Sequence, residues 1–134
     1  MKAAEIPHRM LSQDAFSRWM GIEVLHAGPG LCKLGMTVRA DMLNSMGKAH
    51  GGVSYTLADS AFGFAANSLG KYAVSIESSI YHIEALDLGD YLVAESIVDV
   101  TKTKVGFHVV EVKRDEEIVA LFKGVVYRTS KEWK

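Results

Sequence analysis

The stretch that decides the fold runs from Gly51 to Asn67 and reads GGVSYTLADSAFGFAAN. It is rich in alanine, leucine and phenylalanine and has no run of β-branched residues, and Gly70 follows shortly after it. This composition predicts one long helix that ends near the glycine. Its apolar residues occupy nearly all sides, so we expect the helix to be buried rather than to lie on a surface.

Strands are predicted on both sides of this helix. A short helix at about residues 12–20, with Ser12 as its N-cap, comes first. Two strands joined by a Gly-Pro-Gly turn follow it, and four β-rich stretches separated by short polar breaks come after the long helix. The predicted strands are residues 22–27, 31–39, 72–83, 90–100, 105–113 and 118–128.

The lengths of these elements predict how they pack. A helix of 17 residues spans about 25 Å, whereas strands of 9 to 12 residues reach roughly 30 to 40 Å and can curl around it. Breaks of hairpin length make neighbouring strands antiparallel. A ferredoxin-like fold would need a second helix between the later strands, where none is predicted. We therefore expect one α+β domain over residues 1–134, an antiparallel sheet wrapped around one central helix, which is the hotdog arrangement.

Composition excludes several classes of protein. The 134 residues are 49% hydrophobic and 23% charged, and 15 Lys and Arg against 16 Asp and Glu give a net charge of -1. This balance argues against a dedicated nucleic-acid or membrane-surface protein, and Asp59 disfavours a membrane span through the apolar middle of the chain. The single cysteine, Cys32, excludes an internal disulfide. With no apolar run of signal-peptide length at the N-terminus, we expect a cytoplasmic protein.

Asp59 is the only formally charged residue between Ala49 and Gly70. A carboxylate buried without a partner costs several kcal/mol, so it persists where it is paired, lies at a cleft or does chemistry. Two interpretations follow from the residues alone. Asp59 is either a catalytic carboxylate or a helix position that faces solvent or bonds a neighbouring strand.

The start of the helix carries a second signal. Gly51 and Gly52 are poor helix formers, but they leave backbone N–H groups unobstructed at the positive end of the helix. Such groups form oxyanion holes for ester or thioester carbonyls, and the alternative is a tight helix start without a ligand. His50 is interpreted as a cap or loop-orienting residue rather than a base. Asn44 would be an ordinary turn residue but for its place six residues before His50.

A distance argument links these features. Gly51 and Gly52 lie seven or eight residues before Asp59, which is roughly 10 to 12 Å along one helix. An oxyanion donor and a catalytic base must each lie near 3 Å from the atoms that react. If both are catalytic, they come from different chains, so we predict an active site shared across a two-fold dimer interface.

No cofactor or metal is expected. There is no P-loop, no Gly-x-Ser-x-Gly elbow and no dinucleotide-binding fingerprint. The histidines show no metal-ligand spacing with cysteine or carboxylates. They are His8, His26, His50, His82 and His108.

The spacing of Asn44, His50-Gly51-Gly52 and Leu57-Ala58-Asp59 resembles the signature of hotdog-fold acyl-CoA thioesterases, in the phenylacetic-acid-degradation (PaaI-like) branch. Leu88-Gly89-Asp90 and residues 118–124 are similar to later strands of the same family. The resemblance covers roughly residues 15 to 128. It implies hydrolysis of an acyl-CoA to a free acid and coenzyme A, by homotetramers built from two hotdog dimers.

The resemblance also implies roles for individual residues. Asp59 would be general base or nucleophile. The N–H of Gly52, with that of Gly51 as a further candidate, would polarise the thioester carbonyl. Asn44 would position water and His50 would support the loop.

Further expectations concern the rest of the site. Ser75 is the best match to an assisting serine on the strand after the helix, and Tyr55, Phe62 and Met46 are candidates to line the acyl pocket. Two alternatives stay open: a non-catalytic acyl-CoA-binding hotdog module, and a hotdog dehydratase acting on hydroxyacyl thioesters.

Overall fold

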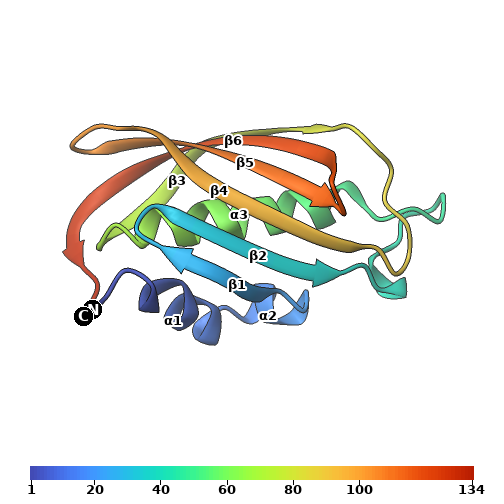
Figure 1. Ribbon diagram of the computed structural model, residues 1–134, viewed down its shortest axis with the longest axis horizontal. Coiled ribbons are helices and arrows are strands. Elements are labelled where there is room, and N and C mark those ends of the chain that lie inside the picture. The colour runs from blue at the N-terminus through green and yellow to red at the C-terminus, as the bar shows by residue number, and fades with distance from the viewer.

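The computed structural model describes every residue from Met1 to Lys134 and shows one curved sheet over one long helix (Figure 1). The elements, in chain order, are α1 (Glu5–Gln13), α2 (Ala15–Trp19), β1 (Glu23–Gly28), β2 (Leu31–Thr37), a 3-10 turn (Ala40–Met42), α3 (Gly51–Asn67), β3 (Lys71–His82), β4 (Tyr91–Thr101), β5 (Val105–Arg114) and β6 (Glu117–Glu132).

The six strands form one sheet in the order β1-β2-β4-β5-β6-β3, and all neighbours are antiparallel. The sheet curves over α3, and α1 and α2 lie beside β1 (Figure 1). The hotdog prediction is confirmed. The predicted strand starts and ends agree with those of the structure to within two residues, except that β6 extends four residues further, to Glu132.

The core lies between α3 and the concave face of the sheet. Leu57, Ala58, Ala61, Phe62 and Ala65 are completely buried on α3. Small residues let the helix approach the strands, and Gly124 on β6 makes room for a ring: a Cβ at this glycine would lie 2.6 Å from Cζ of Phe62. The sheet contributes buried residues from its central strands, among them Cys32, Leu34, Leu92, Ala94, Val110, Val112, Phe122 and Val126.

The expected burial of α3 is confirmed for ten of its 17 residues, but the face opposite the sheet stays accessible in one chain. Asp59 is exposed, and Tyr55, Thr56, Ser60 and Gly63 are only partly covered. The sheet curves over one side of the helix only, while α2 reaches the other side at one point, where Ser17 Oγ lies 2.8 Å from Ser60 Oγ. The face of α3 that carries Asp59 is therefore only partly covered within one chain.

The predicted helix over residues 12–20 is present as α2 (Ala15–Trp19), but its start and its N-cap were predicted wrongly, and α1 before it was not predicted. The structure has two helices broken at Asp14, whose backbone is extended (φ -97°, ψ 93°). Asp14 is the N-cap of α2, because its Oδ1 accepts a hydrogen bond from the N–H of Ser17 at 2.9 Å. Ser12, the expected cap, lies in the last turn of α1 and donates its hydroxyl to the carbonyl of Arg9. Capping preferences do not distinguish Ser12 from Asp14, and the local geometry selects the latter.

No helix in this chain has both the length and the apolar character needed to cross a bilayer.

The close approach of Gly124 to Phe62 gives a test of the core. Gly124→Ala should lower the free energy of unfolding by about 1–3 kcal/mol, because the new methyl group overlaps a buried ring. Gly28→Ala on β1 is the matched control: a Cβ there meets nothing within 4 Å, so it should change the free energy of unfolding by no more than about 0.5 kcal/mol. Chemical denaturation measures both. Equal stability of Gly124→Ala and the unmodified protein would contradict this packing.

A buried histidine makes stability depend on pH. His108 on β5 is 1% exposed, and neither ring nitrogen has a hydrogen-bond partner. Its ring stacks edge-on against Phe62, with 5.4 Å between centroids. Burial, and secondarily the positive charge of Arg128, lowers the pKa of His108 from 6.5 to about 4.

Because the unfolded chain binds the proton more strongly, this contribution to stability is fully present above about pH 6.5. It declines as the pH falls toward about 4, by at most about 3 kcal/mol. The free energy of unfolding, measured between pH 7 and 4, should decrease by this amount as the pH falls. His108→Leu should remove that part of the slope of the free energy of unfolding against pH. His26→Leu, at an exposed position on β1, should keep it. An unchanged slope in His108→Leu would refute the assignment.

Candidate active site

The loop before α3 is held by Asn44. Its Oδ1 accepts hydrogen bonds from the N–H groups of Met46 (2.9 Å) and Lys48 (3.1 Å), and its own N–H donates to the carbonyl of Lys48. The loop turns at Gly47, which has a φ of 75°. The carbonyl oxygen of the Asn44 side chain is therefore committed to the loop, which leaves the amide NH2 group for contacts outside it.

His50 caps the helix. Its Nδ1 accepts a hydrogen bond from the N–H of Gly52 at 2.9 Å, and its own N–H donates to the carbonyl of Met42. The interpretation of His50 as a helix cap agrees with this hydrogen bond.

The two glycines consequently differ. The N–H of Gly52 already donates a hydrogen bond to Nδ1 of His50. Gly51 is the first residue of α3 and is exposed, and an N–H at the first helical position has no acceptor within the helix. Gly51 is therefore the glycine whose N–H is free to bind a ligand.

A hollow of about 260 Å³ opens beside this helix start. Asn44, His50 and Gly51 line it, together with Ser54 on α3 and His82 at the end of β3. The structure thus brings together three of the predicted site residues. It adds His82, which the sequence analysis noted only in connection with metals.

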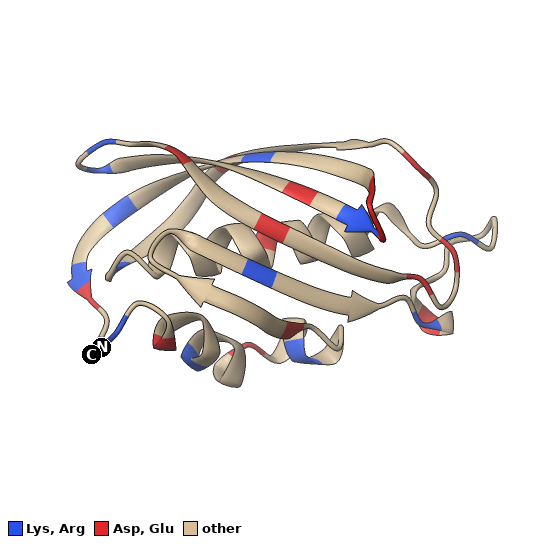
Figure 2. Cartoon of the chain, viewed as in Figure 1, with Lys and Arg blue, Asp and Glu red and all other residues tan.

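Asp59 lies elsewhere on the same helix. It is eight residues after Gly51, about 12 Å along the axis, and it does not line the hollow. Partial burial raises its pKa, and the negative charge of Asp14 adds to the effect. It is the only acidic residue on α3, and Figure 2 shows how acidic and basic residues are distributed over the whole chain. One chain therefore does not place Asp59 beside Gly51.

Ser75 is also distant from the hollow. It is exposed near the start of β3 and precedes His82 by seven residues, which is roughly 23 Å along a strand. Within one chain Ser75 and Gly51 do not meet.

One predicted acyl-pocket residue is wrong. Phe62 is completely buried on the sheet side of α3 and contacts Phe122, with 5.4 Å between ring centroids. The position of a residue around the helix axis, and not its apolar character alone, determines whether it can line a pocket. Phe62 lies on the face of α3 that the sheet covers. Tyr55 is half-buried, and its hydroxyl lies 2.6 Å from Ser78 Oγ, while Met46 is 80% exposed beside the hollow.

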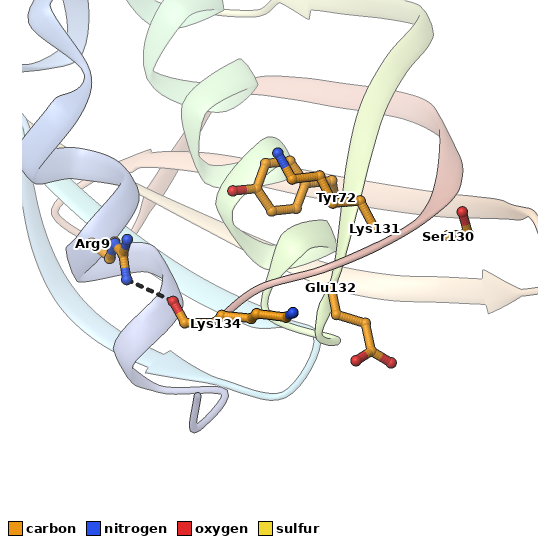
Figure 3. Close-up of a pocket in the computed structure, with 6 residues that line it drawn as sticks. All are labelled: Arg9, Tyr72, Ser130, Lys131, Glu132 and Lys134. Carbon is orange, nitrogen blue, oxygen red and sulfur yellow. Dashed lines mark hydrogen bonds between the residues drawn. The ribbon is translucent and has the colours of Figure 1, made fainter.

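Two other cavities differ in character. A groove of about 290 Å³ runs between α2 and the first turns of α3, and it is lined by Phe16, Trp19 and Gly52 among others. A further cavity, about 480 Å³, is lined by Arg9 on α1, Tyr72 on β3 and residues near the C-terminus, and Figure 3 shows this mostly polar lining. It contains none of the predicted site residues.

The side chains form no group of three or more His, Cys, Asp or Glu that is placed to hold a metal ion.

Comparison with known proteins gives the family. The family model of the Thioesterase superfamily matches residues 46–121. The chain is 35% identical over 128 residues to the acyl-coenzyme A thioesterase PaaI of Escherichia coli, which covers 95% of this chain and 91% of that protein.

Solved structures agree with this match. The structure of the E. coli PaaI protein superposes with a TM-score of 0.92 at 32% identity, over 96% of this chain and 94% of that one. A Streptococcus pneumoniae protein described as a hypothetical thioesterase, determined with coenzyme A, has a TM-score of 0.86 at 25% identity, over 93% and 98%. The chain belongs to the Thioesterase superfamily, and the predicted resemblance to PaaI-like thioesterases is confirmed.

Proposed function

We propose that this protein hydrolyses an acyl-CoA thioester to a free carboxylic acid and coenzyme A. The observation that carries the proposal is the exposed residue Gly51 at the start of α3, whose N–H has no acceptor within the helix, together with Asp59 as the only carboxylate on that helix. The similarity to the E. coli acyl-coenzyme A thioesterase and to a neighbour determined with coenzyme A supports this choice of substrate. The buried thiol of Cys32 fits a reducing, cytoplasmic location.

The chemistry follows from these two groups. The thioester carbonyl oxygen accepts a hydrogen bond from the N–H of Gly51, which stabilises the negative charge that develops there. Asp59 takes a proton from a water molecule as that water attacks the carbonyl carbon. The carbon–sulfur bond then breaks, its electron pair goes to sulfur, and the proton from Asp59 completes the thiol of coenzyme A.

The site requires two chains. Since Gly51 and Asp59 of one helix are about 12 Å apart, Gly51 acts with Asp59 of the partner subunit. β3 is the surface that fits a second copy, because this 12-residue edge strand pairs only with β6. Apolar side chains are exposed along it, including Val74 (54%), Ile76 (58%) and Tyr81 (73%). Such an edge pairs readily with another strand. Two such dimers then form the homotetramer implied by the family resemblance.

The remaining predicted residues take supporting roles in this arrangement. Asn44 holds the loop and directs its amide NH2 group outward to position water. His50 orients the helix start by holding the N–H of Gly52, so Gly51 replaces Gly52 as the oxyanion donor. Ser75 joins the site from the same chain as Asp59, because it lies far from Gly51 of its own chain.

Replacing the proposed base tests the function. Asp59→Asn should lower kcat for thiol release by about 10²–10⁴-fold, the usual contribution of a positioned general base. Because the pKa of Asp59 is raised, the acid limb of the wild-type pH profile should lie above the ordinary range of an aspartate. Thiol release from a panel of aryl, short-chain and long-chain acyl-CoAs, monitored with a thiol reagent, measures both effects.

Asp99→Asn, at an exposed position on β4, is the matched control and should keep full turnover. A near-normal kcat in Asp59→Asn would contradict the assignment of Asp59 as the general base. Tight acyl-CoA binding by the unmodified protein without thiol release would indicate a binding module instead. Loss of water from a hydroxyacyl-CoA would indicate a dehydratase.

A further inference from the structure

We propose that the imidazole of His82 is a second oxyanion donor, and that its Nε2–H acts beside the N–H of Gly51. This inference rests on the proposed thioester hydrolysis and adds a catalytic residue to it. His82 is the last residue of β3, where it pairs with Ala120 of β6. Its side chain lines the same hollow as Gly51 and Asn44.

The position of the ring relative to Gly51 carries the argument. A Cβ built on Gly51 would lie 3.3 Å from Nε2 of His82. The backbone of Gly51 and the ring edge of His82 therefore border the same small space, and only a residue without a side chain leaves that space open. A carbonyl oxygen placed there meets two donors, which is the usual composition of an oxyanion hole.

Ser54 determines which ring nitrogen carries the proton. This serine is 2% exposed, and its Oγ lies 3.2 Å from Nδ1 of His82. The other acceptor near the hydroxyl, the carbonyl of Gly51, is 3.5 Å away, at the limit of a hydrogen bond. A Ser54 hydroxyl that donates to Nδ1 leaves the proton of the neutral ring on Nε2. Ser54 is thus a positioning residue for His82.

Two other polar side chains of the hollow are held by contacts outside it. The ammonium group of Lys48 pairs with Asp87 at 2.6 Å, and Nδ1 of His50 accepts from the N–H of Gly52. The Nε2 atom of His82 borders the space beside Gly51, so His82 is the side chain that can add a hydrogen bond to a carbonyl oxygen placed there, while the amide of Asn44 is assigned to water. The ring of His82 transfers no proton and only donates a hydrogen bond that stabilises the tetrahedral intermediate. The partner's Asp59 accepts the proton from water.

Substitution of His82 separates a donor from a merely structural ring. His82→Phe keeps a planar ring but removes the N–H, and it should lower kcat by about 10²–10³-fold, as loss of one oxyanion donor does, with KM changed little. His82→Gln retains an N–H donor and should recover at least about tenfold of that loss. Ser54→Ala should lower kcat less than His82→Phe, because the ring keeps its donor but loses its preferred tautomer.

His26→Phe, at an exposed position on β1, is the matched control and should keep wild-type kcat. Thermal unfolding and oligomeric state are measured for every variant. If His82→Phe does not fold, His82→Ala assayed with added imidazole replaces it, and rescue of kcat by imidazole is the expected result.

The outcomes are distinguishable. A kcat of His82→Phe near that of the wild type, with Asp59→Asn inactive, would overturn the role of His82 and leave the thioesterase intact. Equal losses in folded His82→Phe and His82→Gln, or no rescue by imidazole, would also overturn it. Absence of thiol release from the unmodified protein would overturn the proposed function itself.

Discussion

The packing of α3 against the concave face of the sheet is the interaction on which the rest of the structure depends. Leu57, Ala58, Ala61 and Phe62 are completely buried in that contact. It fixes the rotation of the helix, so that Asp59 is left on the uncovered face. It also fixes the position of the helix start, which brings Gly51 beside the end of β3 and His82. The packing of α3 against the sheet therefore determines the positions of both the proposed base and the proposed oxyanion donors.

The same helix keeps Gly51 and Asp59 of one chain apart, so one chain supplies only half of a site. Its rise of about 1.5 Å per residue holds Gly51 and Asp59 roughly 12 Å from each other, and a helix packed along most of its length cannot bend to close this gap. A second copy of the chain supplies the missing half, and the unpaired edge of β3 and the uncovered face of α3 give it surfaces to contact. In this account, association is a requirement of the chemistry.

Much of the fold could be predicted because local signals agreed with it. The start and end of α3 were predicted correctly, and the alternation of strands with turn residues located the sheet. Three features depend on contacts that the sequence does not display. Asp14 rather than Ser12 caps a helix, Phe62 turns toward the sheet rather than a ligand, and His50 takes the N–H of Gly52. His82 was missed because β3 and α3 meet only in three dimensions.

Complementation between two inactive chains tests the shared site most directly. Gly51→Pro disables the oxyanion side of the site, because it removes one N–H and its ring enters the space beside His82. Proline is well tolerated at the first helical position, and the extended backbone of His50 (ψ 142°) suits a following proline. Co-expressed with Asp59→Asn, Gly51→Pro should form mixed dimers with one intact site. The account predicts that each variant alone is nearly inactive and that the mixture recovers about a quarter of wild-type kcat per chain. A mixture of proven heterodimers no more active than its parents would contradict it.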